Sequence, residues 1–240
     1  MVQVCLNGSR GGSDGAGVPL SPEAMAEAAA EAVAAGAGEV HVHPKTPCGQ
    51  DSLSPRVVAA TVDTIRARVS VPVGVTTGAW AAPDPAERLA RVRGWSVLPD
   101  FASVNWHEPG AERIAAQLLT MGIGVEAGIW SGTDGAARFA VSPLGPKMLR
   151  VLAEVTDPDP DTAETSARSL LSDLGEAHSR PVLLHGEEGG TWPVLRLARR
   201  LGLATRVGLE DTLLLPDGQR ASDNAELVTA ALRIPWGSQG

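Results

Sequence analysis

The stretch Ser21–Pro44 reads SPEAMAEAAAEAVAAGAGEVHVHP, and it predicts one helix followed by one strand. Ser21 and Pro22 are typical of a helix start, because a serine side chain accepts hydrogen bonds from free backbone N–H groups and proline fits the first turn. The alanine-rich run that follows favours helix. Gly36 predicts the helix end, since glycine readily adopts the left-handed conformation found there. The valines of Glu39–His43 then indicate a buried strand.

Similar units repeat outward from this stretch along the whole chain. The expected strands are Val2–Leu6, Glu39–His43, Pro72–Thr76, Phe101–Asn105, Ile123–Ala127, Arg150–Val155, Pro181–His185 and Thr205–Leu209. The expected helices are Pro22–Ala35, Pro55–Val69, Asp84–Trp95, Gly110–Met121, Gly135–Met148, Asp161–Ala177, Thr191–Leu201 and Ser222–Leu232. Because the strands are mostly apolar throughout, we expect them to be parallel and covered by helices on their outer face.

Eight such units predict an α/β protein with a (β/α)8 or TIM barrel, which typically needs about 250 residues. The chain has 240 residues and no evident linker, so we expect one domain over residues 1–240. A doubly wound open sheet is the alternative fold. However, no GxGxxG phosphate-binding turn follows the first expected strand. The sequence therefore favours the closed barrel.

Composition excludes several classes of function. The formal net charge of −8 argues against nucleic acid as the main partner and against binding to an anionic membrane surface. No apolar run approaches the ~20 residues of a membrane span, and the first residues lack the layout of a signal peptide. Cys5 and Cys48 are interpreted as reduced thiols, so we expect a cytoplasmic protein. We expect His178 to lie on the surface.

Polar residues recur at the carboxyl ends of the expected strands. Barrel enzymes build their active sites at this end, from the loops that follow the strands. The residues there are Asn7, His41, His43, Thr76, Thr77, Asn105, Glu126, Glu154, His185, Glu210 and Asp211. One polar residue in such a loop is ordinary, but a ring with histidines and carboxylates indicates a functional site.

His41 and His43 point to the same face of their strand, because successive side chains alternate. Burying two imidazoles is costly unless both find partners, and a metal ion would satisfy both. Glu210, at the end of the last strand, is the best third ligand. Two histidines, a carboxylate and an open position suit a catalytic Zn²⁺, although Mn²⁺ or Fe²⁺ would also accept this set. A metal-free surface strand or core network is the alternative for the histidine pair alone.

Three further positions are candidates for catalysis or substrate binding. Asp211 could act as a base beside the metal, or it could be an ordinary loop residue. Arg206 lies in an apolar strand and must find an anionic partner. That partner is either a substrate carboxylate or one of Glu210, Asp211 and Glu126. Thr76–Gly78 offers hydroxyl groups and a close approach of the backbone, as many turns do.

With these residues identified, the chain resembles the β-keto acid cleavage enzymes, the family of 3-keto-5-aminohexanoate cleavage enzyme. The resemblance covers nearly the full length. It rests, in the family's order, on LNG, AAGAGEVHVHP, VTTGA, FASVN, GVEAG, RVGLEDTLLLPDG and DNAELV. The histidine-pair and Glu-Asp segments together are fairly specific, whereas either segment alone is weak.

The resemblance implies a (β/α)8 barrel that binds Zn²⁺ through His41, His43 and Glu210. It also implies that a β-keto acid and acetyl-CoA, as co-substrate, give acetoacetate and a new acyl-CoA. Asp211 would then help to form the nucleophilic carbon, and Arg206 would orient the substrate carboxylate. The resemblance further implies a homo-oligomer, a tetramer or dimer.

The resemblance assigns other residues as well. Thr76 or Thr77 stands where the family has a serine near the reacting centre, and Glu126 matches a family glutamate facing the metal. We expect further substrate contacts from Asn7, Thr77, Gly78 and Asn105.

The sequence also departs from the family. Arg10 occupies the position of a family glutamate that meets a substrate ammonium group, so we expect Arg10 to bind a second substrate carboxylate instead. Thr212 replaces the asparagine that commonly follows Glu-Asp. The short loops leave the acyl-CoA contacts undefined.

Two alternative functions stay open at this point. A metal-dependent barrel aldolase or hydrolase would act without CoA; such hydrolases usually carry the histidine pair on the first strand and a carboxylated lysine. Here the pair lies on the second strand, and the nearest lysine, Lys45, directly follows it. A barrel with a structural metal and no catalytic activity is the other alternative, since a fold does not define a function.

Overall fold

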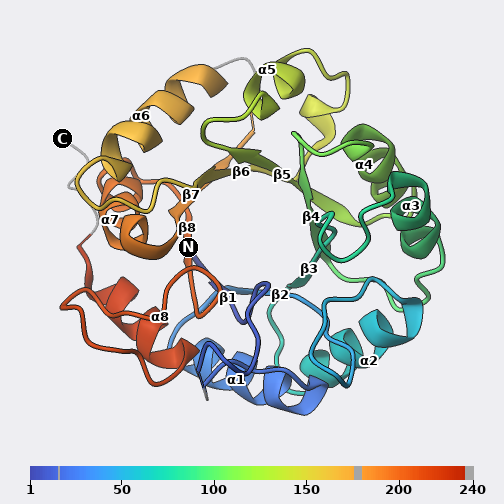
Figure 1. Ribbon diagram of the computed structural model, residues 1–240, viewed down its shortest axis with the longest axis horizontal. Helices are drawn as coiled ribbons and strands as arrows, with labels where there is room; N and C mark the ends of the chain where they lie inside the picture. Colours follow the sequence, from blue (N-terminus) through green and yellow to red (C-terminus); the bar gives the residue numbers. More distant parts are fainter. Residues whose placement is uncertain (16, 176–179, 236–240) are drawn as a thin grey trace.

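The computed structural model describes residues 1–15, 17–175 and 180–235. Its eight strands are all parallel and form a ring seen down its axis in Figure 1, in the order β7-β6-β5-β4-β3-β2-β1-β8. The strands are β1 (Val2–Cys5), β2 (Glu39–Val42), β3 (Val73–Thr76), β4 (Phe101–Asn105), β5 (Gly124–Trp130), β6 (Arg150–Val155), β7 (Val182–Gly186) and β8 (Thr205–Val207). The predicted (β/α)8 barrel is confirmed.

The ring is nearly closed by a short junction between β7 and β8. Leu183 pairs with Ala204 in a single parallel bridge, and the Leu184 N–H donates to the Ala204 carbonyl at 2.9 Å. The Thr205 hydroxyl donates to the Leu184 carbonyl at 2.8 Å. A side-chain hydrogen bond therefore adds to the backbone pairing of β8, the shortest strand.

In the described part of the chain, eight α-helices surround the ring (Figure 1). They are α1 (Pro22–Ala34), α2 (Pro55–Arg66), α3 (Pro85–Arg93), α4 (Ala111–Thr120), α5 (Gly135–Ala140), α6 (Ala163–Leu174), α7 (Thr191–Arg200) and α8 (Asn224–Arg233). As predicted, Ser21 caps α1, since its hydroxyl accepts a hydrogen bond from the Ala24 N–H at 3.2 Å. The apolar faces of the helices pack on the β-branched outer face of the barrel.

Three expected boundaries are wrong for identifiable reasons. Helix α5 ends at Ala140 rather than at Met148, because Pro143 and Pro146 lack the N–H groups that a longer helix needs. Strand β5 continues to Trp130, beyond the expected end at Ala127. Strand β8 ends at Val207, so Glu210 lies in the turn that follows and not in the strand.

Some expectations fall outside the described residues, namely His178 and the last two positions of the expected helix Asp161–Ala177. Within residues 1–15, 17–175 and 180–235, no helix combines the length and the apolarity that crossing a membrane requires.

The amino end of the barrel interior holds a buried cluster of charged side chains. Glu126 accepts hydrogen bonds from Arg150 Nε at 2.8 Å and from Gln3 Nε2 at 2.9 Å. Arg150 also pairs with Glu39 and lies over the Phe101 ring. Because β5 runs on past Glu126, this carboxylate does not lie at the carboxyl end of its strand, contrary to the expectation from the sequence. Its partners belong to the amino ends of β1 and β6, where it balances a buried guanidinium.

Candidate metal centre

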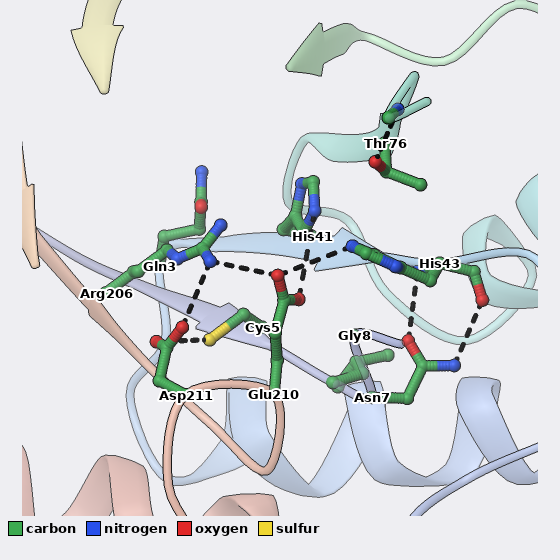
Figure 2. Close-up of polar contacts among 12 residues, drawn as sticks. Gln3, Cys5, Asn7, Gly8, His41, His43, Thr76, Arg206, Glu210 and Asp211 are labelled. Atoms are coloured by element: carbon green, nitrogen blue, oxygen red, sulfur yellow. Dashed lines mark hydrogen bonds and ion pairs between the residues drawn. The ribbon is translucent and has the colours of Figure 1, made fainter. Parts of the chain in front are cut away.

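Two neighbouring parts of the barrel mouth bring three ligand-type side chains together. His41 lies in β2, His43 directly follows it, and Glu210 comes from the turn after β8. One ligand atom from each residue lies within 4.8 Å of the others. Figure 2 shows both imidazoles directed at the Glu210 carboxylate, with His43 Nε2 at 3.4 Å and His41 Nε2 at 3.8 Å from its oxygens. The predicted ligand set is thus assembled in space.

The geometry and charge of this cluster fit a divalent cation. Four-coordinate Zn²⁺ holds ligand atoms at about 2.0–2.1 Å, which separates neighbouring ligands by about 3.4 Å. The Glu210 Oε2 atom is buried without a hydrogen-bond partner among the described residues. Burial would lower the pKa of both imidazoles, yet Glu210 and Asp51 raise the pKa of His43 to about 9. Burial dominates at His41 and lowers its pKa to about 3. The cluster thus favours positive charge beside Glu210, which a metal would supply.

His43 also has the outer partner expected of a metal ligand. Its Nδ1 lies 3.5 Å from Asp51 Oδ1, and a carboxylate in this position orients a ligating imidazole. Lys45 fixes that carboxylate, since its Nζ lies 2.8 Å from Asp51 Oδ1 and donates to the Gly8 carbonyl at 2.6 Å. The sequence analysis missed Asp51, because no fixed spacing links it to the histidine pair.

Asn7 holds the backbone at His43 and does not point freely into the mouth. Its Nδ2 donates to the carbonyls of His43 and Pro19 at 3.0 and 3.1 Å, and its Oδ1 accepts from the His43 N–H at 2.9 Å (Figure 2). All of these groups are buried. These contacts position a candidate ligand, and the expected substrate contact of Asn7 stays a prediction.

Arg206 is occupied by protein carboxylates. Its Nη2 donates to Glu210 Oε1 at 2.9 Å and to Asp211 Oδ1 at 3.0 Å, and its side chain is only 2% exposed. Burial would raise the pKa of Glu210, but Arg206 and His43 outweigh it and hold that pKa well below its usual range. The sequence left open a substrate carboxylate or an internal acid as the partner of Arg206, and the structure shows the internal acids Glu210 and Asp211.

Asp211 is buried beneath the candidate ligands. It accepts a hydrogen bond from the Cys5 thiol at 2.8 Å and lies 3.6 Å from His185 Nδ1. Burial would raise the pKa of Asp211, yet Arg206 and His185 lower it. A carboxylate so thoroughly paired is a weak base. Its contacts position Arg206, and its role as a base beside the metal stays a prediction.

The ends of β6 and β7 add an acidic group, Glu187, that the sequence analysis did not single out. Glu154 Oε2 lies 3.4 Å from His185 Nε2. Burial and the neighbouring Glu154 raise the pKa of Glu187 to about 9. Glu187 therefore carries a proton at neutral pH and can act as an acid at the mouth.

The polar residues at the carboxyl ends of β3 and β4 lie at the barrel mouth as expected, but they differ in whether a hydrogen-bond donor is left for a substrate. Thr76 Oγ1 accepts from the Gly78 N–H at 3.0 Å, which leaves its proton free for a substrate atom. The Thr77 hydroxyl is used, since it donates to the Ser103 carbonyl at 2.7 Å. Asn105 Nδ2 donates to Glu108 at 2.9 Å. Of the two hydroxyl groups, that of Thr76 donates its proton to no acceptor within the described residues.

Arg10 lies at the mouth but is already paired. Its Nε donates to the Leu209 carbonyl at 2.6 Å, and its Nη2 lies 2.7 Å from Glu188 Oε1. The positive charge that we expected to meet a second substrate carboxylate is thus balanced by the protein. Its binding role stays a prediction that must compete with Glu188.

The turn that carries Glu210 depends on close packing at Gly208. A Cβ at this position would overlap the Cys5 carbonyl oxygen, which is backbone and cannot move aside. We therefore expect Gly208→Ala to lower the free energy of unfolding by about 3 kcal/mol, the upper part of the overpacking range. Urea denaturation measures this change. Gly11→Ala is the control, because no described atom lies within 4 Å of its added Cβ. Equal stability of the two variants would contradict the packing argument.

Several solved structures share the barrel. ObcA in a ternary complex with a C4-CoA adduct and oxalate has a TM-score of 0.66 and 18% identity, over 89% of this chain and 62% of that chain. A type I 3-dehydroquinate dehydratase from Clostridium difficile has a TM-score of 0.62 and 10% identity, over 97% of this chain and 89% of that chain. These likenesses concern the fold alone. The chain spans less than two thirds of ObcA.

The search of curated proteins found no match to this chain. A family model described as beta-keto acid cleavage enzyme, in contrast, matches residues 1–128 and 144–236. These two ranges include the histidine pair of β2 and the turn with Glu210. From the match over most of its length, we conclude that the chain belongs to the β-keto acid cleavage enzyme family.

Proposed function

We propose that this protein is a zinc-dependent β-keto acid cleavage enzyme that uses acetyl-CoA as co-substrate. In this reaction the C2–C3 bond of the β-keto acid breaks, and C2 joins the acetyl carbonyl carbon to give acetoacetate. The CoA sulfur passes to the released acyl group, so the reaction needs no further reagent. The observation that carries the proposal is the convergence of His41, His43 and Glu210 at the mouth of a barrel of this family. The ObcA complexes, described with a C4-CoA adduct and with oxaloacetate, also support such substrates.

The protein's own side chains would hold the metal, orient the reacting groups and transfer protons. His41, His43 and Glu210 would hold the metal, which when bound would supply a Lewis acid for the keto oxygen. Arg206 fixes the Glu210 carboxylate from below. The Thr76 hydroxyl can donate to a substrate oxygen, and Asp211 is the candidate base that would take the C2 proton. Asp51 holds the ring of His43 in place.

A hydrolase is less well supported, because Lys45 is not available as a metal ligand. Its Nζ is engaged by Asp51 and by the Gly8 carbonyl, and its side chain is 1% exposed. A carboxylated lysine at this position would have to break both contacts. The two contacts of Lys45 therefore favour carbon–carbon bond cleavage over hydrolysis that uses a carboxylated lysine as metal ligand.

The proposed function is tested by incubating the zinc-loaded protein with β-keto acids, with and without acetyl-CoA. We expect acetoacetate and a new acyl-CoA to form in equal amounts, both detected by mass spectrometry, and only when acetyl-CoA is present. Glu31→Gln serves as the matched variant, since this exposed carboxylate lies on helix α1, outside the candidate ligand set and the mouth residues named above. Consumption of the keto acid without acetyl-CoA would contradict the exchange and favour an aldolase.

A further inference from the structure

Four aromatic rings form a continuous row at the mouth, beginning at the candidate metal ligand His43. The Trp80 ring is nearly parallel to the His43 ring, at 9° with centroids 5.6 Å apart. Trp130 follows at 6.3 Å and 27°, and His107 packs on Trp130 at 4.7 Å. The row thus extends from the end of β2 past the β3 turn to the end of β5.

Trp80 is held in this row while much of its surface stays exposed. Its side chain is 42% exposed to solvent, because the offset rings cover only part of the indole face. The ring lies directly against Gly78, where any Cβ would overlap it. The VTTGAW turn therefore makes room for the indole to lie over the backbone. An indole that is fixed by its neighbours and partly exposed presents an apolar surface at little cost in conformational entropy.

The charged groups of the mouth argue against a second charged group on the substrate. Arg10 is balanced by Glu188, and Lys45 is balanced by Asp51. Arg206 is buried against Glu210 and Asp211. Each of these three cations at the described mouth therefore has an anionic partner already. A substrate carboxylate bound by any of these three cations would have to displace its protein partner, whereas an apolar group would only need the exposed part of the indole.

We propose that Trp80 and Trp130 form the subsite for the acyl side chain of the β-keto acid, and that this side chain is flat and apolar, such as a phenyl ring. The inference rests on the proposed function, whose substrate class it names. The keto carbon would lie beside His43, and the ring attached to it would lie against the exposed part of the Trp80 indole. Offset stacking and edge contacts with indole favour such a ring over a short alkyl or charged chain.

The test compares three β-keto acids with acetyl-CoA: 3-oxo-3-phenylpropanoate, 3-oxohexanedioate and 5-amino-3-oxohexanoate. We expect kcat/KM for the phenyl substrate to exceed the other two by about tenfold or more. Trp80→Ala is expected to lower the ratio of phenyl to dicarboxylate kcat/KM by about tenfold, and Trp80→Phe to retain most of it. Leu201→Ala, which truncates another exposed apolar side chain at 46% exposure, should not change the ratio.

A binding measurement separates failure of this inference from failure of the proposed function. Titration calorimetry is expected to show that the unreactive 3-phenylpropanoate binds the native chain and that its Kd rises about tenfold in Trp80→Ala, with hexanedioate as the control ligand. Acyl-CoA products with a preference for the dicarboxylate or the amino acid would overturn the inference and leave the proposed function standing. If no keto acid reacts, the proposed function fails, and the binding difference alone decides whether the subsite exists.

Discussion

Replacing His43 by alanine is expected to abolish retention of zinc and to lower kcat/KM for the β-keto acid exchange by about a thousandfold or more, which corresponds to about 4 kcal/mol of transition-state stabilisation. The physical reason is the small number of ligands. His41 and Glu210 alone leave a two-ligand site, whereas catalytic zinc sites use three protein ligands. The Asp51 carboxylate that orients His43 would also lose its imidazole partner.

Metal content per chain, measured by atomic emission after dialysis, and acyl-CoA formation check this prediction together. The fold should persist, because the barrel core is built by apolar side chains distant from the mouth. The melting temperature distinguishes a catalytic metal from a structural one. Glu31→Gln is again the control and should keep both metal and activity. A His43→Ala protein with full activity would remove the metal centre from the mechanism.

Replacing Arg206 by methionine is expected to lower the free energy of unfolding by about 3–5 kcal/mol, because it leaves the buried carboxylates without their cation. Glu210 and Asp211 accept hydrogen bonds from the same guanidinium nitrogen, whose side chain is buried. Methionine fills a similar volume, so the loss reports charge rather than a cavity. Chemical denaturation at pH 7 measures the change.

Arg10→Met provides the matched comparison, since it removes a guanidinium of the same mouth from an exposed pair. Glu188 is 56% exposed on its side chain, so water screens this pair, and we expect a loss of at most about 1 kcal/mol. A double variant, Arg206→Met with Asp211→Asn, should recover part of the stability, because it removes one of the two unpaired carboxylates. Equal effects of the two arginine substitutions would show that burial does not decide the energy of these pairs.

The repeating pattern of the sequence determined the fold and the candidate ligand triad. The signals are local: apolar runs with β-branched residues, helix starts such as Ser21 and Pro22, and glycines at helix ends. Because the same order of strand and helix signals repeats eight times, few folds other than a (β/α)8 barrel are compatible with it. The two-residue period of a strand is enough to place His41 and His43 on one face. The rule that parallel strands end together then brings Glu210, far along the chain, to the same mouth.

Only the tertiary structure decided which polar side chains remain available to a substrate. Arg206, Asn7 and Thr77 are candidates for binding from their positions, but each hydrogen-bonds to protein groups that its own strand does not specify. Glu126 lies at the opposite end of its strand from the mouth because β5 runs on to Trp130. Strand periodicity gives the direction of a side chain, but not its partner. A partner depends on register and on the closure of the barrel, which bring distant residues within hydrogen-bonding distance.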